Sequence, residues 1–133
     1  MNVLLSIKPK YANAILTGEK KVEFRKALFK NDVKRVYIYS SAPEQKIIGY
    51  FTIDEIVSAS PKKLWKEFNP VGVINEEEFF DYFADKSIGY SIKIKKVKKF
   101  SKFIDPKKVF DNFFPPQSFM YCDRIESLAG NVG

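Results

Sequence analysis

The order of apolar and polar residues along the chain predicts a protein built mainly from β-strands. Apolar runs or a strict alternation of apolar and polar residues mark five predicted strands, at residues 3–7, 21–25, 33–41, 46–58 and 88–97. Gly49 lies inside the fourth of these segments and indicates a bulge or a close approach of another backbone. The alternation breaks at Lys96 and Val97, where we expect a bulge or the end of the fifth strand.

Three helices are predicted between these strands. Pro9 suits the first turn of a helix, which continues to Leu16 and ends at Gly18 as its C-cap. Ser60 before a proline and Asn75 before three glutamates are typical helix N-caps, and they predict two further helices. These two helices form an insert that carries many Phe residues.

The chain length and the order of elements predict one β-rich α+β domain with a small closed barrel. The chain has 133 residues, enough for one ordinary domain but not for two. We therefore assign residues 1–133 to a single domain, with a core over about residues 2–122 and a C-terminal tail over 123–133. The extended segment 115–121 is expected to close the sheet.

The composition excludes several kinds of site. The chain contains no His and one Cys, so it cannot form a Ser-His-Asp triad, an internal disulfide or a Cys/His zinc site. Proton transfer must then come from Lys, Glu, Asp, Tyr or backbone groups. No metal site and no cofactor is predicted, although a carboxylate site for magnesium or calcium stays open.

The sequence predicts a cytoplasmic protein that does not span a membrane. Its apolar runs are far shorter than the roughly 20 residues that a membrane helix needs. The N-terminus lacks the basic region and the cleavage site of a secretory signal. Cys122 has no Cys partner, which suits a reducing compartment, and we expect its thiol to be buried and inert. The sequence gives no indication of the oligomeric state.

The charge is positive and unevenly distributed. The net charge is +7, made up of +4 over residues 1–58, −2 over 59–86 and +5 over 87–133. A basic surface with an acidic insert suggests a polyanion as the partner, with the insert turned away from it. The last part includes a row of six lysines, Lys93, Lys95, Lys96, Lys98, Lys99 and Lys102. This row suits either a phosphate backbone or the protection of a strand edge against aggregation.

The segment around Lys20 is the strongest candidate for chemistry. Glu23 and Arg25 are two residues apart on a predicted strand, so they share one face at roughly 6.5–7 Å. Val22 and Phe24 point to the other face and are expected to be buried. Lys20 lies in the preceding turn, which we expect to be exposed. The three charged residues could bind an anion, could tune the lysine as a base, or could form ordinary surface ion pairs.

The spacing G-x-K-x-x-E-x-R, at Gly18, Lys20, Glu23 and Arg25, resembles the signature of the ASCH domain family of the PUA-like superfamily. Further segments look like a small bacterial or phage ASCH subgroup, namely 6–9, 39–43, 47–49 and 115–119. The resemblance covers residues 2–122. It implies a PUA-like barrel of about five to seven strands, with an N-terminal helix and a helical insert. The motif would lie in a basic cleft between the barrel and the first helix.

The resemblance also implies a function connected with RNA. ASCH domains are expected to bind RNA or a nucleotide-like ligand, and some are ribonucleases. One branch is an acetylcytidine amidohydrolase that uses a lysine, a threonine and a glutamate. Lys20 matches that lysine, whereas Glu23 occupies the threonine position and only the run 76–78 offers a source for the glutamate. Three hypotheses stay open: an RNA or nucleotide binder, a hydrolase with Lys20 as base and Glu23 beside it, and a regulatory protein-interaction module.

Nine residues are predicted to contact the ligand: Lys8, Lys20, Glu23, Arg25, Tyr39, Ser40, Ser41, Gln117 and Ser118. Lys20 and Arg25 would meet a phosphate or a carbonyl oxygen, and Glu23 would orient them. Tyr39 would stack on a base. The serines and Gln117 would donate to a phosphate or a base edge.

Overall fold

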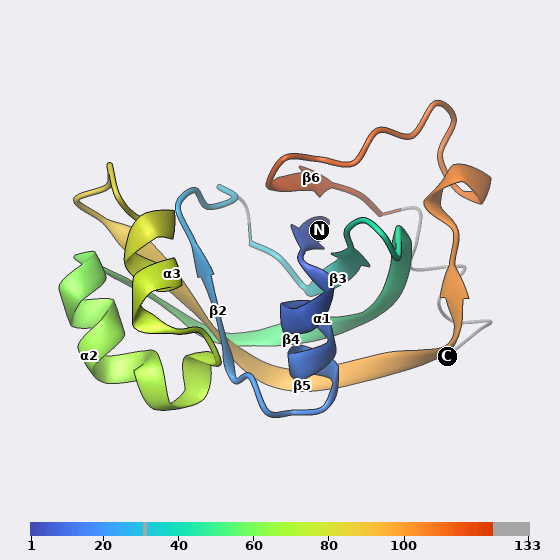
Figure 1. Cartoon of the computed structure of the whole chain (residues 1–133). Helices are drawn as coiled ribbons and strands as arrows, with labels where there is room; N and C mark the ends of the chain where they lie inside the picture. The colour runs from blue at the N-terminus through green and yellow to red at the C-terminus, as the bar shows by residue number, and fades with distance from the viewer. Residues whose placement is uncertain (31, 124–133) are drawn as a thin grey trace.

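The computed structural model describes residues 1–30 and 32–123 (Figure 1). The strands are β1 (Asn2–Ile7), β2 (Val22–Arg25), β3 (Arg35–Ser40), β4 (Lys46–Ala59), β5 (Gly89–Ile104) and β6 (Phe119–Tyr121). The helices are α1 (Pro9–Leu16), α2 (Pro61–Gly72), α3 (Glu76–Tyr82) and the 3-10 turn η1 (Pro106–Lys108). The predicted α+β class is confirmed. The predicted tail lies, beyond Asp123, outside the described residues.

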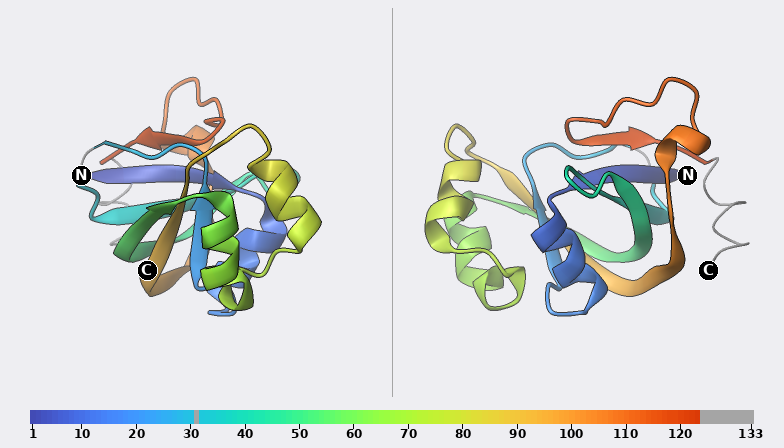
Figure 2. Two further views of the ribbon diagram at one scale, coloured as in Figure 1. Left: turned by 90° about the vertical axis from the view of Figure 1, so that its left-hand side faces the viewer. Right: turned by 45° about the vertical axis from the view of Figure 1, so that its right-hand side comes forward.

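The strands form one mixed sheet in the order β2-β5-β4-β3-β1-β6. β1 and β3 are parallel, and the other neighbours are antiparallel. The long strands β4 and β5 curve strongly, which gives the sheet the shape of a half-barrel (Figure 2). Within the described residues, no backbone pairing joins β2 to β6. The half-barrel is therefore open on this side, and the expectation of a closed barrel is corrected.

The irregular pairing of β4 with β5 explains the glycine in β4. The register shifts between Ile47 and Gly49. A Cβ atom on Gly49 would meet the Lys98 carbonyl oxygen and would lie 3.1 Å from the Leu16 side chain. The predicted close backbone approach is thus confirmed. β5 does not end at Lys96, because a register shift next to it lets the strand continue to Ile104.

The hydrophobic core has three parts. One part lies between the sheet and α1, and it includes Val3, Ile15 and Phe51. A second part, around Tyr37 and Phe100, lies on the other side of the sheet. The third joins α2 and α3 to β2, where the rings of Phe24 and Phe79 meet edge-on at 4.9 Å. Within the described residues, no helix has the length and apolar character needed to cross a membrane.

The close approach at Gly49 leads to a stability prediction. We expect Gly49→Ala to lower the free energy of unfolding by on the order of 2–3 kcal/mol, because a backbone oxygen blocks the added methyl group. Gly18→Ala is the matched control: its φ of 83° is strained for alanine, but the space around it is open, so about 1 kcal/mol is expected. Urea unfolding of both variants checks this, and equal losses would contradict the close approach.

Candidate functional site

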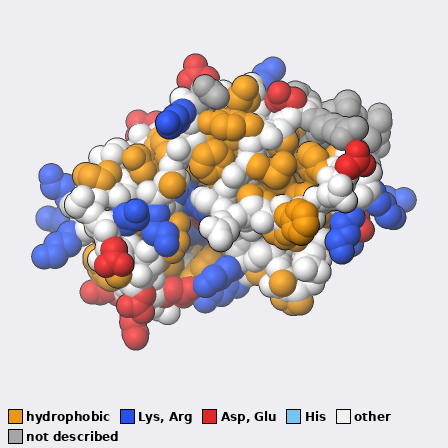
Figure 3. All heavy atoms as spheres, turned by 90° about the horizontal axis from the view of Figure 1, so that it is seen from above, with side chains coloured by type: hydrophobic (Ala, Val, Ile, Leu, Met, Phe, Trp, Pro, Cys, Tyr) orange, Lys and Arg blue, Asp and Glu red, His pale blue; other side chains and the backbone are white. Residues whose placement is uncertain are grey.

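A pocket of about 640 Å³ opens between the half-barrel and the helical insert. Its walls come from the end of β1, from α1, from β2, from α3 and from the loop before β6. Figure 3 shows this side of the molecule from above, hollowed between the insert and the sheet, with Lys and Arg side chains at its margin. The volume lies in the usual range of ligand pockets, roughly 300–1,000 Å³.

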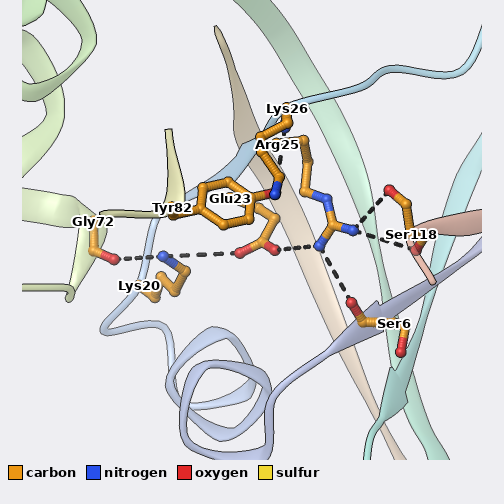
Figure 4. A network of polar contacts seen from close by, with 8 residues as sticks. All are labelled: Ser6, Lys20, Glu23, Arg25, Lys26, Gly72, Tyr82 and Ser118. Atoms are coloured by element: carbon orange, nitrogen blue, oxygen red, sulfur yellow. Dashed lines mark hydrogen bonds and ion pairs between the residues drawn. The ribbon is translucent and has the colours of Figure 1, made fainter. Parts of the chain in front are cut away.

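Lys20, Glu23 and Arg25 form a continuous line of charges in this pocket (Figure 4). Lys20 Nζ is 3.8 Å from Glu23 Oε1, and Arg25 Nη1 donates to Glu23 Oε2 at 3.1 Å. All three residues are buried, with 3%, 6% and 8% of their surface exposed. The ordinary reading as surface ion pairs is therefore wrong. The predicted burial of Val22 and Phe24 is confirmed, and the whole strand is buried because both of its faces are covered.

Arg25 uses most of its hydrogen-bonding capacity within the protein. Its Nη1 also donates to the Ser6 carbonyl oxygen at 3.2 Å. Its Nη2 donates to the Ser118 carbonyl oxygen at 3.3 Å and to the Ser118 hydroxyl at 2.9 Å. A guanidinium has five N–H donors, and only the buried Nε–H is without a partner among the described residues. Arg25 is thus placed to hold the walls of the pocket rather than to meet a phosphate with its full fork.

Lys20 has an unusual environment for an ammonium group. Its Nζ donates to the Gly72 carbonyl oxygen and lies 5.2 Å and 5.1 Å from the ring centres of Tyr11 and Phe24. Burial lowers the pKa of Lys20 from its usual value, and the nearby Glu23 carboxylate opposes this shift only in part. The expectation that Lys20 is exposed is wrong. Gly18 and Glu19 of the turn are exposed, but the Lys20 side chain is buried in the pocket, where Gly72 of the insert accepts its hydrogen bond.

Local geometry explains how Lys20 reaches this position. Gly18 ends α1 with a left-handed φ of 83°, and the Lys20 amide then donates to the Ala14 carbonyl at 3.0 Å. The chain enters β2 at once, where Val22 pairs with Lys93. A helix end, a tight glycine turn and a strand are thus combined within eight residues, as the motif predicts.

The structure brings most of the predicted contact residues to this pocket. Besides the charged line, Lys8, Ser41, Gln117 and Ser118 contribute to its lining. Tyr39 and Ser40 do not, and these two predictions are corrected. Both are buried on β3, and Tyr39 packs in the second core cluster, 5.4 Å from the ring of Phe113. A buried ring has no free face on which a base could stack.

The sequence analysis did not predict several residues that line the pocket, chiefly Tyr11, Lys26, Glu78 and Tyr82. Glu78 lies 3.2 Å from Lys10 Nζ and 3.8 Å from Lys8 Nζ. The Tyr11 hydroxyl and these ammonium groups hold the pKa of Glu78 below its usual value, against the effect of burial. Burial and the neighbouring Glu78 raise the pKa of Tyr11, so its phenol keeps its proton. In the sequence, the three consecutive glutamates at 76–78 were the only indication that Glu78 could belong to the site.

The pocket is close to neutral rather than strongly basic. Four lining residues are basic (Lys8, Lys20, Arg25, Lys26) and three are acidic (Glu23, Glu78, Asp81). The acidic insert therefore faces the pocket and is not turned away from it. Within the described part of the chain, no group of three or more His, Cys, Asp or Glu side chains is placed to hold a metal ion.

A family model described as "Domain of unknown function (DUF365)" matches residues 1–111. The chain is 27% identical over 127 residues to an ASCH domain-containing ribonuclease of Zymomonas mobilis, covering 93% of this chain and 86% of that protein. The crystal structure of an ASCH protein from Zymomonas mobilis superposes with a TM-score of 0.88 at 25% identity, covering 98% and 93% of the two chains. A variant of the latter with phenylalanine in place of tyrosine gives 0.91 at 24% identity, over 99% of both chains.

The buried ion line leads to a prediction about stability. Arg25→Gln is expected to lower the free energy of unfolding by about 3–5 kcal/mol, because it leaves the Glu23 carboxylate buried without its stronger partner. Glu23→Gln combined with Arg25→Gln should cost less than the sum of the single changes.

The control for this prediction is the exposed pair Lys93–Glu55, joined at 3.0 Å on the surface. Its double-mutant cycle with Gln should give a coupling of less than about 1 kcal/mol. Urea unfolding measures all of these variants. A coupling between Glu23 and Arg25 no larger than that of the exposed pair would show that the ion line does not hold the pocket together.

Proposed function

Because the chain belongs to the family described as domain of unknown function DUF365 and has the fold of the ASCH proteins, we propose that it binds RNA and seats one nucleotide in the pocket beside Lys20. A similar protein is named as a ribonuclease, which supports RNA as the partner. The net charge of +7 supports a polyanion. We further propose that it acts in the cytoplasm, as expected from its unpaired cysteine.

The shape and lining of the pocket support a nucleotide as the ligand. Its volume of about 640 Å³ is of the right order for one nucleotide. Tyr11 and Tyr82, which are only half-buried, supply aromatic surface, on which a base stacks with about 1–3 kcal/mol. Ser41 and Gln117 supply polar groups that suit the edge of a base or a sugar hydroxyl. These contacts would select a flat, polar ligand.

Two exposed lysines in the lining suit the phosphate of such a nucleotide. Lys8 follows β1 and has 71% of its side chain exposed, with Glu78 as an ion-pair partner at 3.8 Å. Lys26 follows β2, and its Nζ lies 4.6 Å from the centre of the Tyr82 ring. Both can move toward a phosphate at little cost, because their charges are hydrated. Arg25 would contribute by keeping Ser6 and Ser118 in place.

The observation that carries the proposal is the buried Lys20. A protein core seldom contains a lysine, because removing an ammonium group from water is costly. Here the lysine is kept inside a pocket, with a lowered pKa and one carboxylate beside it. Buried groups with a perturbed pKa gather at functional sites. A purely structural role would be served by an apolar side chain.

The lowered pKa of Lys20 favours hydrolysis as a second candidate function. In its neutral form, Lys20 could accept the proton of a ribose 2′-hydroxyl, whose oxygen would then attack the adjacent phosphorus. The 5′-oxygen would leave and take a proton from water or from the Tyr11 phenol, which keeps its proton at neutral pH. The same base could activate a water molecule against an acylated nucleoside. Glu23 offers no hydroxyl for a mechanism that needs a threonine, and Glu78 and Asp81 are the other carboxylates in the pocket lining.

We expect wild-type protein to bind short single-stranded RNA and nucleotides in calorimetric titrations. Tyr82→Leu should weaken binding by about 1–3 kcal/mol, because it removes a stacking surface. Tyr82→Phe is the matched control and should bind nearly as well, since the ring is kept. Thermal unfolding confirms that each variant is folded. No binding by the wild type, or equal binding by Tyr82→Leu, would contradict the proposed pocket.

We expect Lys20→Arg to abolish turnover of RNA oligomers or acylated cytidines, because arginine cannot give up its proton. The wild-type rate should rise with pH as Lys20 loses its proton, with a midpoint below the ordinary lysine pKa of about 10.4. Lys21→Arg, in the exposed position next along the chain, is the control and should keep full activity. Unchanged turnover in Lys20→Arg would remove Lys20 from the chemistry.

A further inference from the structure

The second half of β5 carries lysines along an edge that no described strand covers. β2 pairs only with Tyr90–Lys93, whereas β4 accompanies β5 as far as Ile104. Figure 1 shows this half of β5 continuing past β2 and α1. The exposed lysines of this half are Lys95, Lys96, Lys98, Lys99 and Lys102, here called the β5 lysine row.

The β5 lysine row differs from the lysine that precedes it. Lys93 is held by Glu55 at 3.0 Å and by Asp54 at 3.9 Å. No residue of the row has an ion-pair partner within the described part of the chain. Their charges are therefore available to a partner, and Lys93 is not part of this surface. The row also concentrates positive charge, whereas the pocket itself is close to neutral.

The spacing of the row suits a nucleic-acid backbone. Residues two apart on a strand lie on the same face, about 6.5–7 Å from each other. Successive phosphates along an extended single strand are separated by a comparable distance. Lys96 and Lys98 have this spacing, whereas Lys99 points to the opposite face from Lys98, so the row offers ammonium groups on both faces of this strand edge.

α1 connects the row to the pocket. Its first turn follows Lys8, which lines the pocket. Its last residue, Leu16, packs on Gly49 where the backbone of Lys98 and Lys99 passes. A helix of eight residues is about 12 Å long, so a few nucleotides of extended RNA span the distance.

We propose that the β5 lysine row binds the phosphate backbone of the RNA strand whose nucleotide occupies the pocket. This inference rests on the proposed function, since it takes RNA as the ligand. In this arrangement, β5 provides the part of the RNA affinity that does not depend on base sequence, and the pocket recognises one nucleotide. The competing explanation is that the lysines only prevent this strand edge from pairing with other molecules.

The test compares two triple variants that lose the same charge. Lys98→Gln, Lys99→Gln and Lys102→Gln change the row, whereas Lys62→Gln, Lys63→Gln and Lys66→Gln change exposed lysines on α2. Binding of a fluorescein-labelled 12-nucleotide uridine RNA is followed by anisotropy between 50 and 200 mM KCl, and binding of uridine monophosphate by calorimetry.

We expect the β5 variant to bind the 12-mer more weakly and with a slope of log K against log salt that is shallower by about 2, at about 0.7 for each lost contact with a single strand. The α2 variant should keep the wild-type slope, and all three proteins should bind uridine monophosphate equally.

Three results would overturn the inference, and they are distinguishable. A β5 variant with the wild-type slope and wild-type 12-mer affinity removes the row from RNA binding while the proposed function stands. A β5 variant that keeps the wild-type slope but aggregates in light scattering identifies the lysines as protection of the strand edge. No binding of either ligand by the wild type rejects the proposed function, and this inference with it.

Discussion

The site depends on the three hydrogen bonds that the Arg25 guanidinium donates across the open side of the half-barrel. β2 and β6 lie at opposite ends of the strand order and do not pair. Arg25 on β2 nevertheless reaches Ser6 at the end of β1 and Ser118 just before β6. Side-chain bonds thus take the place of the backbone pairing that would close a barrel. The gap between β2 and β6 remains wide enough to form a pocket, and the side-chain hydrogen bonds hold the pocket walls in place.

The same arginine determines how Lys20 can behave. Glu23 gives one carboxylate oxygen to Arg25 at 3.1 Å and the other to Lys20 at the longer distance of 3.8 Å. With Lys20 protonated, the buried line contains two positive charges and one negative charge. Loss of the Lys20 proton leaves a balanced pair of Glu23 and Arg25. Burial therefore favours the neutral amine, which is the direction of its pKa shift.

Sequence patterns predicted the local elements well because these depend on neighbouring residues. Pro9, the Gly18 cap and the Ser60 and Asn75 caps all mark helix ends in the structure. Alternation failed where both faces of a strand are covered. The alternation around Tyr39 is the same whether its ring faces a ligand or a second core cluster. The ring is buried because distant residues such as Phe113 pack against it. The burial of Lys20 likewise depends on Gly72, 52 residues away.

The helical insert brings negative charge to the pocket wall. Residues 59–86 carry a net charge of −2 in a chain of +7, and they supply Glu78, Asp81 and Tyr82 to the pocket wall. These carboxylates cancel most of the positive charge that the half-barrel brings to the pocket. In the proposed function, this nearly neutral, aromatic pocket would discriminate between ligands by shape and hydrogen bonds, because a bare anion would gain little from entering it. Most of the excess positive charge of the chain lies outside the pocket. There it can attract a polyanion without affecting which ligand the pocket would select.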